Sequence, residues 1–544
     1  MPRLLIPCLL TVALAAALAA GPARAEETAH QAYEQGLAFQ KQRLTLQAIA
    51  AYRRALALDP HLAAAHYELG WSYWVLGEWS QVVQQWEEAQ RLHVDEPLLV
   101  TYLGQARDRL NGKGPPLERV PMHTRAASPA PAAPSTGAAQ AAVGSASQRW
   151  TLELVARFQQ YDPQPGDPAD HYDPAVFSPK SVIFTPDGIK AYVNALEGGE
   201  TVVYDARTGA KLKVIPHRFG AEQAGLFAPA DRAAYGRALA ASGRTHPNWF
   251  TGKPVEFALT HGGRYLWISY YRRDYDREGL LPSAVAIVDT RTDEIVRVMD
   301  CGPIPKFLAA SPDGHWLAII HWGDNTVEFI DISGADPAAF RLAGLVVVER
   351  RLPLDLSQPV DRDHYCGFCL RGSVFTADSR YLLVGRMGGG GIALIDVPRQ
   401  AYLGTVYGMP PTPRHLVLSP DGQWLYVSSN VAGEVSLYRT EDLVRAVLQH
   451  QGSLAPLREV STGSGTRTIA LAPQGRTLFA AVNRESKLVM LDAQTLRPLL
   501  DIAVDSYPVG LAVAPDGGQV WVTSQGVKLQ GGNSVSVYRV ERTP

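Results

Sequence analysis

Residues 419–430 read SPDGQWLYVSSN, a turn sequence followed directly by a strand-like segment. Proline near the start of a turn and glycine at its last position favour a tight β-hairpin connection. The residues after Gly422 include Trp424, Leu425 and Tyr426, the apolar and aromatic types that strands favour. The stretch therefore predicts a β-hairpin, and its copies in the chain decide the fold.

Seven such turns follow one another between Trp150 and the C-terminus, at spacings of 42–75 residues. They occupy residues 185–188, 260–263, 311–314, 376–379, 419–422, 472–475 and 514–517. A second signature, an apolar residue and Asp followed by a polar turn, ends several third strands, at 204–209, 288–293, 395–399 and 491–495. The repeat predicts a mainly β fold, a seven-bladed β-propeller over residues 149–544.

The last repeat lacks a fourth strand, because the chain stops at Pro544 soon after its third strand. Residues 152–158, LELVARF, form a strand-like segment that belongs to no blade of its own. We expect this segment to complete the seventh blade, which closes the ring and removes an exposed strand edge.

The repeats at 419–430 and 514–524 resemble those of the YVTN-type β-propellers. The resemblance covers about residues 150–544 and implies the fold. It implies no single function, because such propellers serve as binding platforms, cell-surface proteins and cofactor-holding enzymes.

Residues 26–111 are predicted to form a helical domain of a different kind. Gly36 and Gly70 are 34 residues apart, and their surroundings match at that offset. The pattern resembles the tetratricopeptide repeat, whose small residues let the two helices of each hairpin pack closely. Two units and a capping helix to about Leu110 make a short α-helical solenoid.

The two domains are joined by residues 112–148, where Pro, Ala, Ser and Gly dominate. This composition buries too little apolar surface to offset the entropy of ordering, so it predicts a flexible linker.

The first 25 residues have the order of a secretory signal peptide: a basic start, an apolar run over 4–20, and Ala-Arg-Ala before a cleavage site after Ala25. This predicts a periplasmic or secreted protein; a retained membrane anchor is the alternative. No second long apolar segment follows, so no stable membrane insertion is expected after cleavage. The mature charge of −4, from 49 basic and 53 acidic residues, gives no sign of nucleic-acid binding.

Five basic residues recur at one position of the repeat, six residues before the second residue of each turn, where the innermost strand begins. They are Lys180, Lys306, Arg371, Arg414 and Arg467, and His415 follows Arg414. Because innermost strands line the axial channel, we expect these side chains to form a basic ring at the channel mouth. Such a ring binds an anionic group or protein surface, unless acidic side chains such as Glu256 pair with it.

The three cysteines of the mature chain, Cys301, Cys366 and Cys369, are expected on the same face as the ring and the long insertions. Covalent haem attachment is excluded, because Leu370 stands where the motif needs histidine. A thioredoxin-like redox site lacks its βαβ context. Two alternatives stay open: a disulfide, either Cys366–Cys369 or one that includes Cys301, and a zinc or copper site that uses His364 with these thiols. The disulfide is favoured for exported thiols.

The sequence thus favours an exported, non-catalytic binding protein that carries no cofactor. The repeat domain would bind a protein partner, and the propeller face would bind an anionic ligand or protein. The alternative is a periplasmic oxidoreductase of the quinoprotein, haem or metal type, with its cofactor at the channel mouth. No hydrolase or zinc-protease motif appears in a suitable setting.

Overall fold

The computed structural model describes residues 28–41, 45–76, 78–94, 99–110, 149–227, 235–240, 242–357, 360–526 and 532–543. The chain divides into two compact units, Met1–Ala138 and Ala139–Pro544. The predicted signal peptide, residues 1–25, and the predicted linker, residues 112–148, lie outside the described residues. Of the helices that are described, none is long and apolar enough to cross a membrane.

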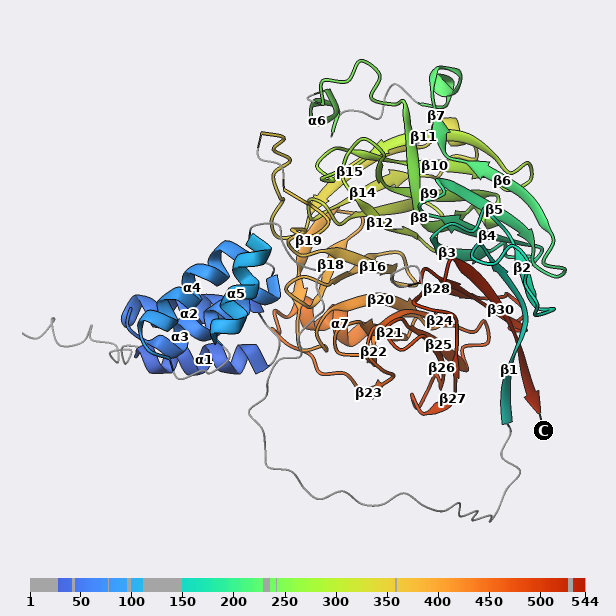
Figure 1. Cartoon of the computed structure of the whole chain (residues 1–544). Helices are drawn as coiled ribbons and strands as arrows, with labels where there is room; N and C mark the ends of the chain where they lie inside the picture. The colour runs from blue at the N-terminus through green and yellow to red at the C-terminus, as the bar shows by residue number, and fades with distance from the viewer. Residues whose placement is uncertain are drawn as a thin grey trace, which may run out of the picture. The chain divides into compact units, whose positions relative to one another are not determined.

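The first unit is an all-helical repeat domain, drawn in blue in Figure 1. Its helices are α1 (Ala29–Lys41), α2 (Thr45–Leu58), α3 (Ala63–Leu76), α4 (Trp79–Arg91) and α5 (Leu99–Leu110). Consecutive helices pack as antiparallel hairpins around a core that includes Tyr52, Leu69 and Trp86. This confirms two repeat units followed by a capping helix.

The 34-residue offset has a direct packing cause. A Cβ atom placed on Gly36 would lie 2.3 Å from Cε1 of Tyr52, and one on Gly70 would lie 2.2 Å from Nε1 of Trp86. In each unit a glycine on the first helix lets an aromatic ring of the second helix approach the backbone. The aromatic ring fills the space that any side chain at the glycine would need.

We predict that Gly70→Ala lowers the free energy of unfolding of the helical domain by about 1–3 kcal/mol, because the added methyl overpacks against Trp86. Gly104→Ala is the matched control, since Gly104 lies in α5 with nothing within 4 Å of an added Cβ. There alanine should be neutral or stabilise by up to about 1 kcal/mol through its higher helix propensity. Urea titration followed by tryptophan fluorescence measures both; equal effects of the two substitutions would contradict the packing explanation.

The second unit is a ring of seven antiparallel sheets (Figure 1). Blades 1 to 3 consist of β3 (Pro179–Phe184), β4 (Lys190–Ala195), β5 (Glu200–Asp205), β6 (Lys211–Pro216); β8 (Phe250–Thr260), β9 (Tyr265–Arg273), β10 (Ser283–Asp289), β11 (Glu294–Cys301); and β12 (Pro305–Ala310), β13 (Trp316–His321), β14 (Thr326–Asp331), β15 (Arg341–Val347). The short β7 (Arg218–Phe219) extends blade 2 by pairing with β8.

Blades 4 to 6 have the same four-stranded order. Their strands are β16 (Leu370–Phe375), β17 (Tyr381–Arg386), β18 (Ile392–Asp396), β19 (Ala401–Val406); β20 (Pro413–Leu418), β21 (Trp424–Ser429), β22 (Glu434–Arg439), β23 (Arg458–Ser461); and β24 (Thr466–Leu471), β25 (Thr477–Val482), β26 (Lys487–Asp492), β27 (Pro498–Ala503). Two short helices, α6 (Gly236–Ala240) and α7 (Thr440–Leu448), interrupt the strands of the ring.

The seventh blade joins the two ends of the propeller, as the sequence predicts. It contains β28 (Pro508–Val513), β29 (Gln519–Ser524) and β30 (Ser534–Thr543), and β1 (Arg149–Gln159) pairs antiparallel with β30. The short β2 (Asp170–Tyr172) covers the outer edge of β1 through parallel pairing. A strand from before the first blade therefore closes the ring.

Hydrogen bonds in the turn at residues 419–422 explain why similar turn sequences recur in the repeats. The Ser419 carbonyl accepts a hydrogen bond from the Gly422 amide at 2.8 Å, and its hydroxyl accepts one from the Trp424 amide at 2.9 Å. Gly422 has a φ of 70°, a conformation that costs glycine little. Asp421 accepts from the Ser419 hydroxyl and from the Gln423 amide. Ser419 and Asp421 thus satisfy backbone groups of the turn, and Gly422 supplies its positive φ.

Apolar layers between neighbouring blades hold the ring together. Val327 and Phe329 of blade 3, for example, pack against Leu382 and Val384 of blade 4. The faces between blades are buried, while the innermost strands contact one another in sequence around the ring, from β3 through β28 and back to β3. The packing leaves the polar residues of the innermost strands facing the axis.

Candidate functional site

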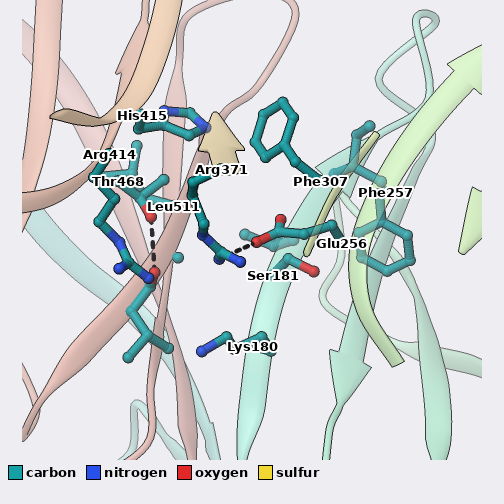
Figure 2. Close-up of a pocket in the computed structure, with 14 residues that line it drawn as sticks. Lys180, Ser181, Glu256, Phe257, Phe307, Arg371, Arg414, His415, Thr468 and Leu511 are labelled. Atoms are coloured by element: carbon teal, nitrogen blue, oxygen red, sulfur yellow. Dashed lines mark hydrogen bonds and ion pairs between the residues drawn. The ribbon is translucent and has the colours of Figure 1, made fainter. Parts of the chain in front are cut away.

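A cavity of about 140 Å³ lies where the innermost strands meet. Every blade contributes to its wall: Lys180 of β3, Glu256 of β8, Phe307 of β12, Arg371 of β16, Arg414 of β20, Thr468 of β24 and Val509 of β28. Figure 2 shows the Arg371, Arg414 and Lys180 side chains reaching into one space, with Glu256 opposite Arg371. This is the axial channel that the repeat predicts.

The structure brings most of the predicted basic ring together. Lys180, Arg371, Arg414 and His415 line the cavity. Arg467 lies close enough for its charge to lower the pKa of both Lys180 and Arg414. The sixth predicted residue, Lys306, begins its strand at the same repeat position, but its ammonium group binds a loop residue.

Two cations of the ring have acidic partners. Arg371 Nη2 donates to Glu256 Oε1 at 2.7 Å, and its Nη1 donates to the Lys306 carbonyl at 2.8 Å. Lys306 Nζ donates to Asp363 and lies 4.0 Å from the centre of the Trp322 ring. Glu256 is the acid that the sequence predicts as a partner for the ring. Asp363 was missed, because it lies in a long insertion 57 residues from Lys306.

The other three cations have no hydrogen-bonded carboxylate among the described residues. Arg414 Nη1 contacts Met387 Sδ at 3.3 Å, and Arg467 Nε donates to the Val509 carbonyl at 3.1 Å. The Lys180 ammonium has neither a hydrogen bond nor an ion pair within this part of the chain. Both arginines are less than a tenth exposed. The cavity therefore holds more positive than negative charge.

The pKa shifts in the cavity follow first from burial and then from this excess of positive charge. Burial, and then the three neighbouring guanidinium groups, lowers the pKa of Lys180 well below its usual range. Burial followed by Arg371 lowers the pKa of Arg467 to about 10. The pKa of His415 falls to about 3, mainly through burial and then through Arg371 and Arg414, so its imidazole is neutral at physiological pH. Every shift disfavours positive charge in the ligand-free cavity.

The cysteines separate into a pair and a single residue. Cys366 and Cys369 form a disulfide with an S–S distance of 1.96 Å, whereas Cys301 is free and buried. Of the pairings that the sequence leaves open, the structure contains Cys366–Cys369. As a disulfide, these two sulfurs supply no thiolate to a metal, and His364 stacks edge-on against Tyr365.

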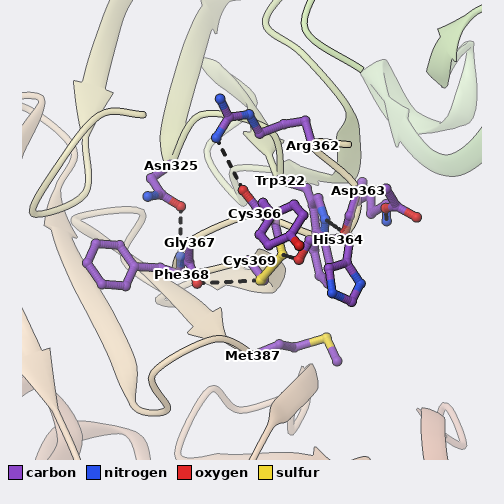
Figure 3. The surroundings of a disulfide bond; sticks show 12 residues. Trp322, Asn325, Arg362, Asp363, His364, Cys366, Gly367, Phe368, Cys369 and Met387 are labelled. Carbon is purple, nitrogen blue, oxygen red and sulfur yellow. Dashed lines mark hydrogen bonds and ion pairs between the residues drawn. A yellow bond between two sulfur atoms is a disulfide. The ribbon is translucent and has the colours of Figure 1, made fainter. Parts of the chain in front are cut away.

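The disulfide loop borders the basic residues, as expected for residues gathered on one face. Figure 3 shows Met387, His364 and Trp322 around the disulfide. The Met387 amide donates to the Cys369 carbonyl at 3.3 Å, and the Met387 sulfur contacts Arg414. Asp363, which binds Lys306, belongs to the same loop. The disulfide loop therefore supplies the partner of Lys306 and contacts the β17–β18 turn, whose Met387 contacts Arg414.

Cys301 belongs to a different cluster, which the sequence analysis missed. Its sulfur lies with ligand atoms of His321 and Glu328, all within 4.8 Å of one another. All three residues are buried. A polar residue in two otherwise apolar strands is the sequence feature that could indicate this cluster. His321 ends WLAIIH, and Glu328 lies within TVEFID.

Comparison with known proteins supports both domains. Residues 39–77 match the family model described as TPR repeat, and residues 373–543 match the one described as Lactonase, 7-bladed beta-propeller. Antigen Lp49 of Leptospira interrogans is 31% identical over 81 residues, which is 14% of this chain; the match spans 18% of that protein's length.

Two solved structures match this chain over about two thirds of its length. Kuenenia stuttgartiensis hydrazine synthase shares 15% identity at a TM-score of 0.46, covering 69% of this chain and 99% of that one. The β-propeller domain of Cps50 (Swd1) from Myceliophteria thermophila shares 13% identity at a TM-score of 0.47, covering 67% and 97%.

Proposed function

We propose that this chain, which joins a tetratricopeptide-repeat domain to a seven-bladed β-propeller, is an exported, non-catalytic binding protein. Its propeller channel binds a small anion, and its helical domain binds a protein partner. The signal-peptide pattern of residues 1–25 supports export to the periplasm or medium. The observation that carries the proposal is the excess of cations in the axial cavity.

Four cations, Lys180, Arg371, Arg414 and Arg467, interact electrostatically around one hydrogen-bonded carboxylate, that of Glu256. Removing charges from water costs several kcal/mol for each ion, and like charges add repulsion. A bound anion offsets both costs, because guanidinium groups form short, paired hydrogen bonds to carboxylate and phosphate oxygens. The cavity is thus preorganised for negative charge.

The size and lining of the cavity limit the ligand. A volume of about 140 Å³ suits a small carboxylate or phosphate rather than a polymer. Phe257, Phe307 and Leu511 form an apolar part of the wall, so the ligand has room for a short carbon skeleton beside its anionic group. We therefore expect small organic acids or phosphate esters to bind more tightly than inorganic chloride.

The helical domain provides the second binding site of the proposal. Tetratricopeptide repeats stack into curved surfaces that bind partner segments. Two binding modules in one chain increase the effective concentration of one ligand near the other. Affinity capture with the full chain would identify the protein partner.

We predict that small di- and tricarboxylates and phosphate esters raise the melting temperature of the purified full chain, with binding that weakens as salt increases. Arg414→Gln should weaken binding at least tenfold, because it removes a charge-assisted hydrogen bond. Arg458→Gln, at an exposed position of β23, is the control and should leave affinity unchanged. Calorimetric titration measures both.

Two results would count against the proposal. If no anion in the panel binds, or if Arg414→Gln and Arg458→Gln bind equally well, the cavity is not the binding site. A chromophore that co-purifies in stoichiometric amount from the native source would favour the alternative, a cofactor-bearing oxidoreductase. An absorbance spectrum of the natively purified protein distinguishes the two.

A further inference from the structure

A second polar cluster lies between blades 2 and 3, formed by β11 of blade 2 and by β13 and β14 of blade 3. Cys301 ends β11, His321 ends β13 and Glu328 lies in β14. Cys301 and His321 are 0% exposed and Glu328 is 1% exposed. A sulfur, a ring nitrogen and a carboxylate oxygen approach within 4.8 Å of one another, and His321 Nε2 lies 3.5 Å from Glu328 Oε2.

The hydrogen bonds behind His321 determine which nitrogen carries its proton. Thr326 Oγ1 donates to Asp324 Oδ1 at 2.6 Å, so it accepts from His321 Nδ1 at 2.9 Å. Arg351 Nε binds the other oxygen of Asp324 at 3.1 Å. The proton therefore lies on Nδ1, and the lone pair of Nε2 faces Cys301 and Glu328. Histidines that bind metals are oriented by this kind of outer hydrogen-bond chain.

Within the cluster, hydrogen-bond acceptor atoms outnumber the N–H and O–H groups that could donate to them. Glu328 Oε2 is buried and has no hydrogen-bond partner among the residues that the structure describes. The amide of Gly302 donates to His321 Nε2 at 3.1 Å and also approaches the Glu328 carboxyl group. The Cys301 thiol donates outward, to the Gly302 carbonyl at 3.6 Å. An unpartnered buried oxygen destabilises the folded protein, and a bound cation would offset this cost.

Other charges near the cluster are already compensated. Asp300 pairs with Arg273 at 2.6 Å, and Asp324 pairs with Arg351. A thiolate and a carboxylate here carry two negative charges, which a divalent cation neutralises.

We propose that Cys301, His321 and Glu328 form a metal site that binds Zn²⁺. Zinc accepts sulfur, nitrogen and oxygen ligands together, and ligands 2.0–2.3 Å from a tetrahedral centre lie roughly 3.3–3.8 Å apart. The His321–Glu328 separation of 3.5 Å already falls in that range. On metal binding, the Gly302 amide hydrogen bond moves from the imidazole to the carboxylate. Three protein ligands leave a fourth position for water or an exogenous group.

This site is independent of the proposed anion-binding cavity. None of its three ligands lines that cavity, and none belongs to the Cys366–Cys369 disulfide. It also differs from the metal site considered from sequence, which grouped Cys301 with His364 and the paired cysteines. The tertiary structure instead places Cys301 with residues of β13 and β14.

The test uses the full chain without an affinity tag, stripped with a chelator and then supplied with Zn²⁺ alone. We expect one zinc per chain after desalting, measured by elemental analysis, and a higher melting temperature with zinc than without. Cys301→Ser and the isosteric Glu328→Gln should each weaken zinc binding at least 100-fold. Thr326→Val, which removes the outer hydrogen bond to His321 together with those to Asp324 and Tyr235, should weaken it about 10–100-fold.

Cobalt provides a readout that does not depend on variant stability. Co²⁺ in the wild-type protein should give a thiolate-to-metal charge-transfer band, absent in Cys301→Ser and retained in the Cys366→Ser, Cys369→Ser double variant. The proposal is overturned if the folded, stripped wild type takes up neither metal. It is also overturned if the band disappears with the double variant but persists in Cys301→Ser.

Discussion

Lys180→Met is expected to stabilise the ligand-free propeller and, at the same time, to weaken anion binding about 10–100-fold. Methionine keeps most of the side-chain volume but removes an ammonium group without a hydrogen-bonded partner, which should raise the free energy of unfolding by about 1 kcal/mol. The bound anion loses one charge-assisted hydrogen bond, worth about 1.5–3 kcal/mol. Chemical denaturation and calorimetric titration measure the two effects on one protein.

Glu256→Gln should produce the opposite pair of effects. It leaves Arg371 without its carboxylate partner at 2.7 Å, so we expect a loss of about 2 kcal/mol in stability and tighter anion binding. Lys253→Met is the control, because Lys253 pairs with Glu197 outside the cavity lining. If Lys180→Met and Glu256→Gln shift stability in the same direction, the excess of positive charge is not what governs the cavity.

The propeller should lose stability in acid through His217, a fully buried histidine between blades 1 and 2. Thr201 Oγ1 donates to Asn194, so it accepts from His217 Nε2 at 2.8 Å, and His217 Nδ1 accepts from Tyr270 at 3.0 Å. Burial lowers the pKa of His217 from 6.5 to about 3. The native imidazole is therefore neutral, and a proton at Nδ1 would face the Tyr270 hydroxyl.

The sign of the effect follows from proton linkage. Below pH 6.5 the unfolded chain binds a proton at His217 that the native protein excludes down to about pH 3. The contribution of His217 to the free energy of unfolding is therefore fully present above pH 6.5. It is lost progressively as the pH falls from 6.5 towards 3. Between pH 7.5 and 4.5 the loss from this residue is about 3 kcal/mol, two pH units at about 1.4 kcal/mol each.

Urea titrations at the two pH values check this result. His217→Gln should lower stability at pH 7.5 but reduce the difference between the two pH values by about 3 kcal/mol. The exposed His171→Gln is the control and should preserve the full difference. An unchanged pH dependence in His217→Gln would show that acid acts elsewhere.

The fold was predictable because its signals are local. The SPDG-type turns each satisfy their own backbone groups within a few residues, as Ser419 does for Gly422 and Trp424. The 34-residue helical repeat is local for the same reason, with Gly70 accommodating Trp86 of the next helix. Even the closing strand was predictable, because β1 was the strand left over once the blades were counted.

The candidate site was predictable only in part. Repeat position placed Lys180, Arg371, Arg414 and Arg467 around one axis, because equivalent positions in a ring of blades face the same way. Repeat position does not predict which of these cations form ion pairs with acidic side chains. The partner of Arg371 lies 115 residues away on β8, and the partner of Lys306 lies in the long connection between β15 and β16.

The sequence by itself determined the number of blades, the closing strand and the helical repeat, since period and turn chemistry depend on neighbouring residues. Only the tertiary structure decided that Lys180 has no hydrogen-bonded acidic partner among the described residues, that Cys366 pairs with Cys369, and that Cys301 meets His321 and Glu328. Those outcomes depend on side chains from separate strands and loops arriving within a few ångströms of one another. Coulomb and hydrogen-bond energies act over such distances, and no repeat pattern specifies them.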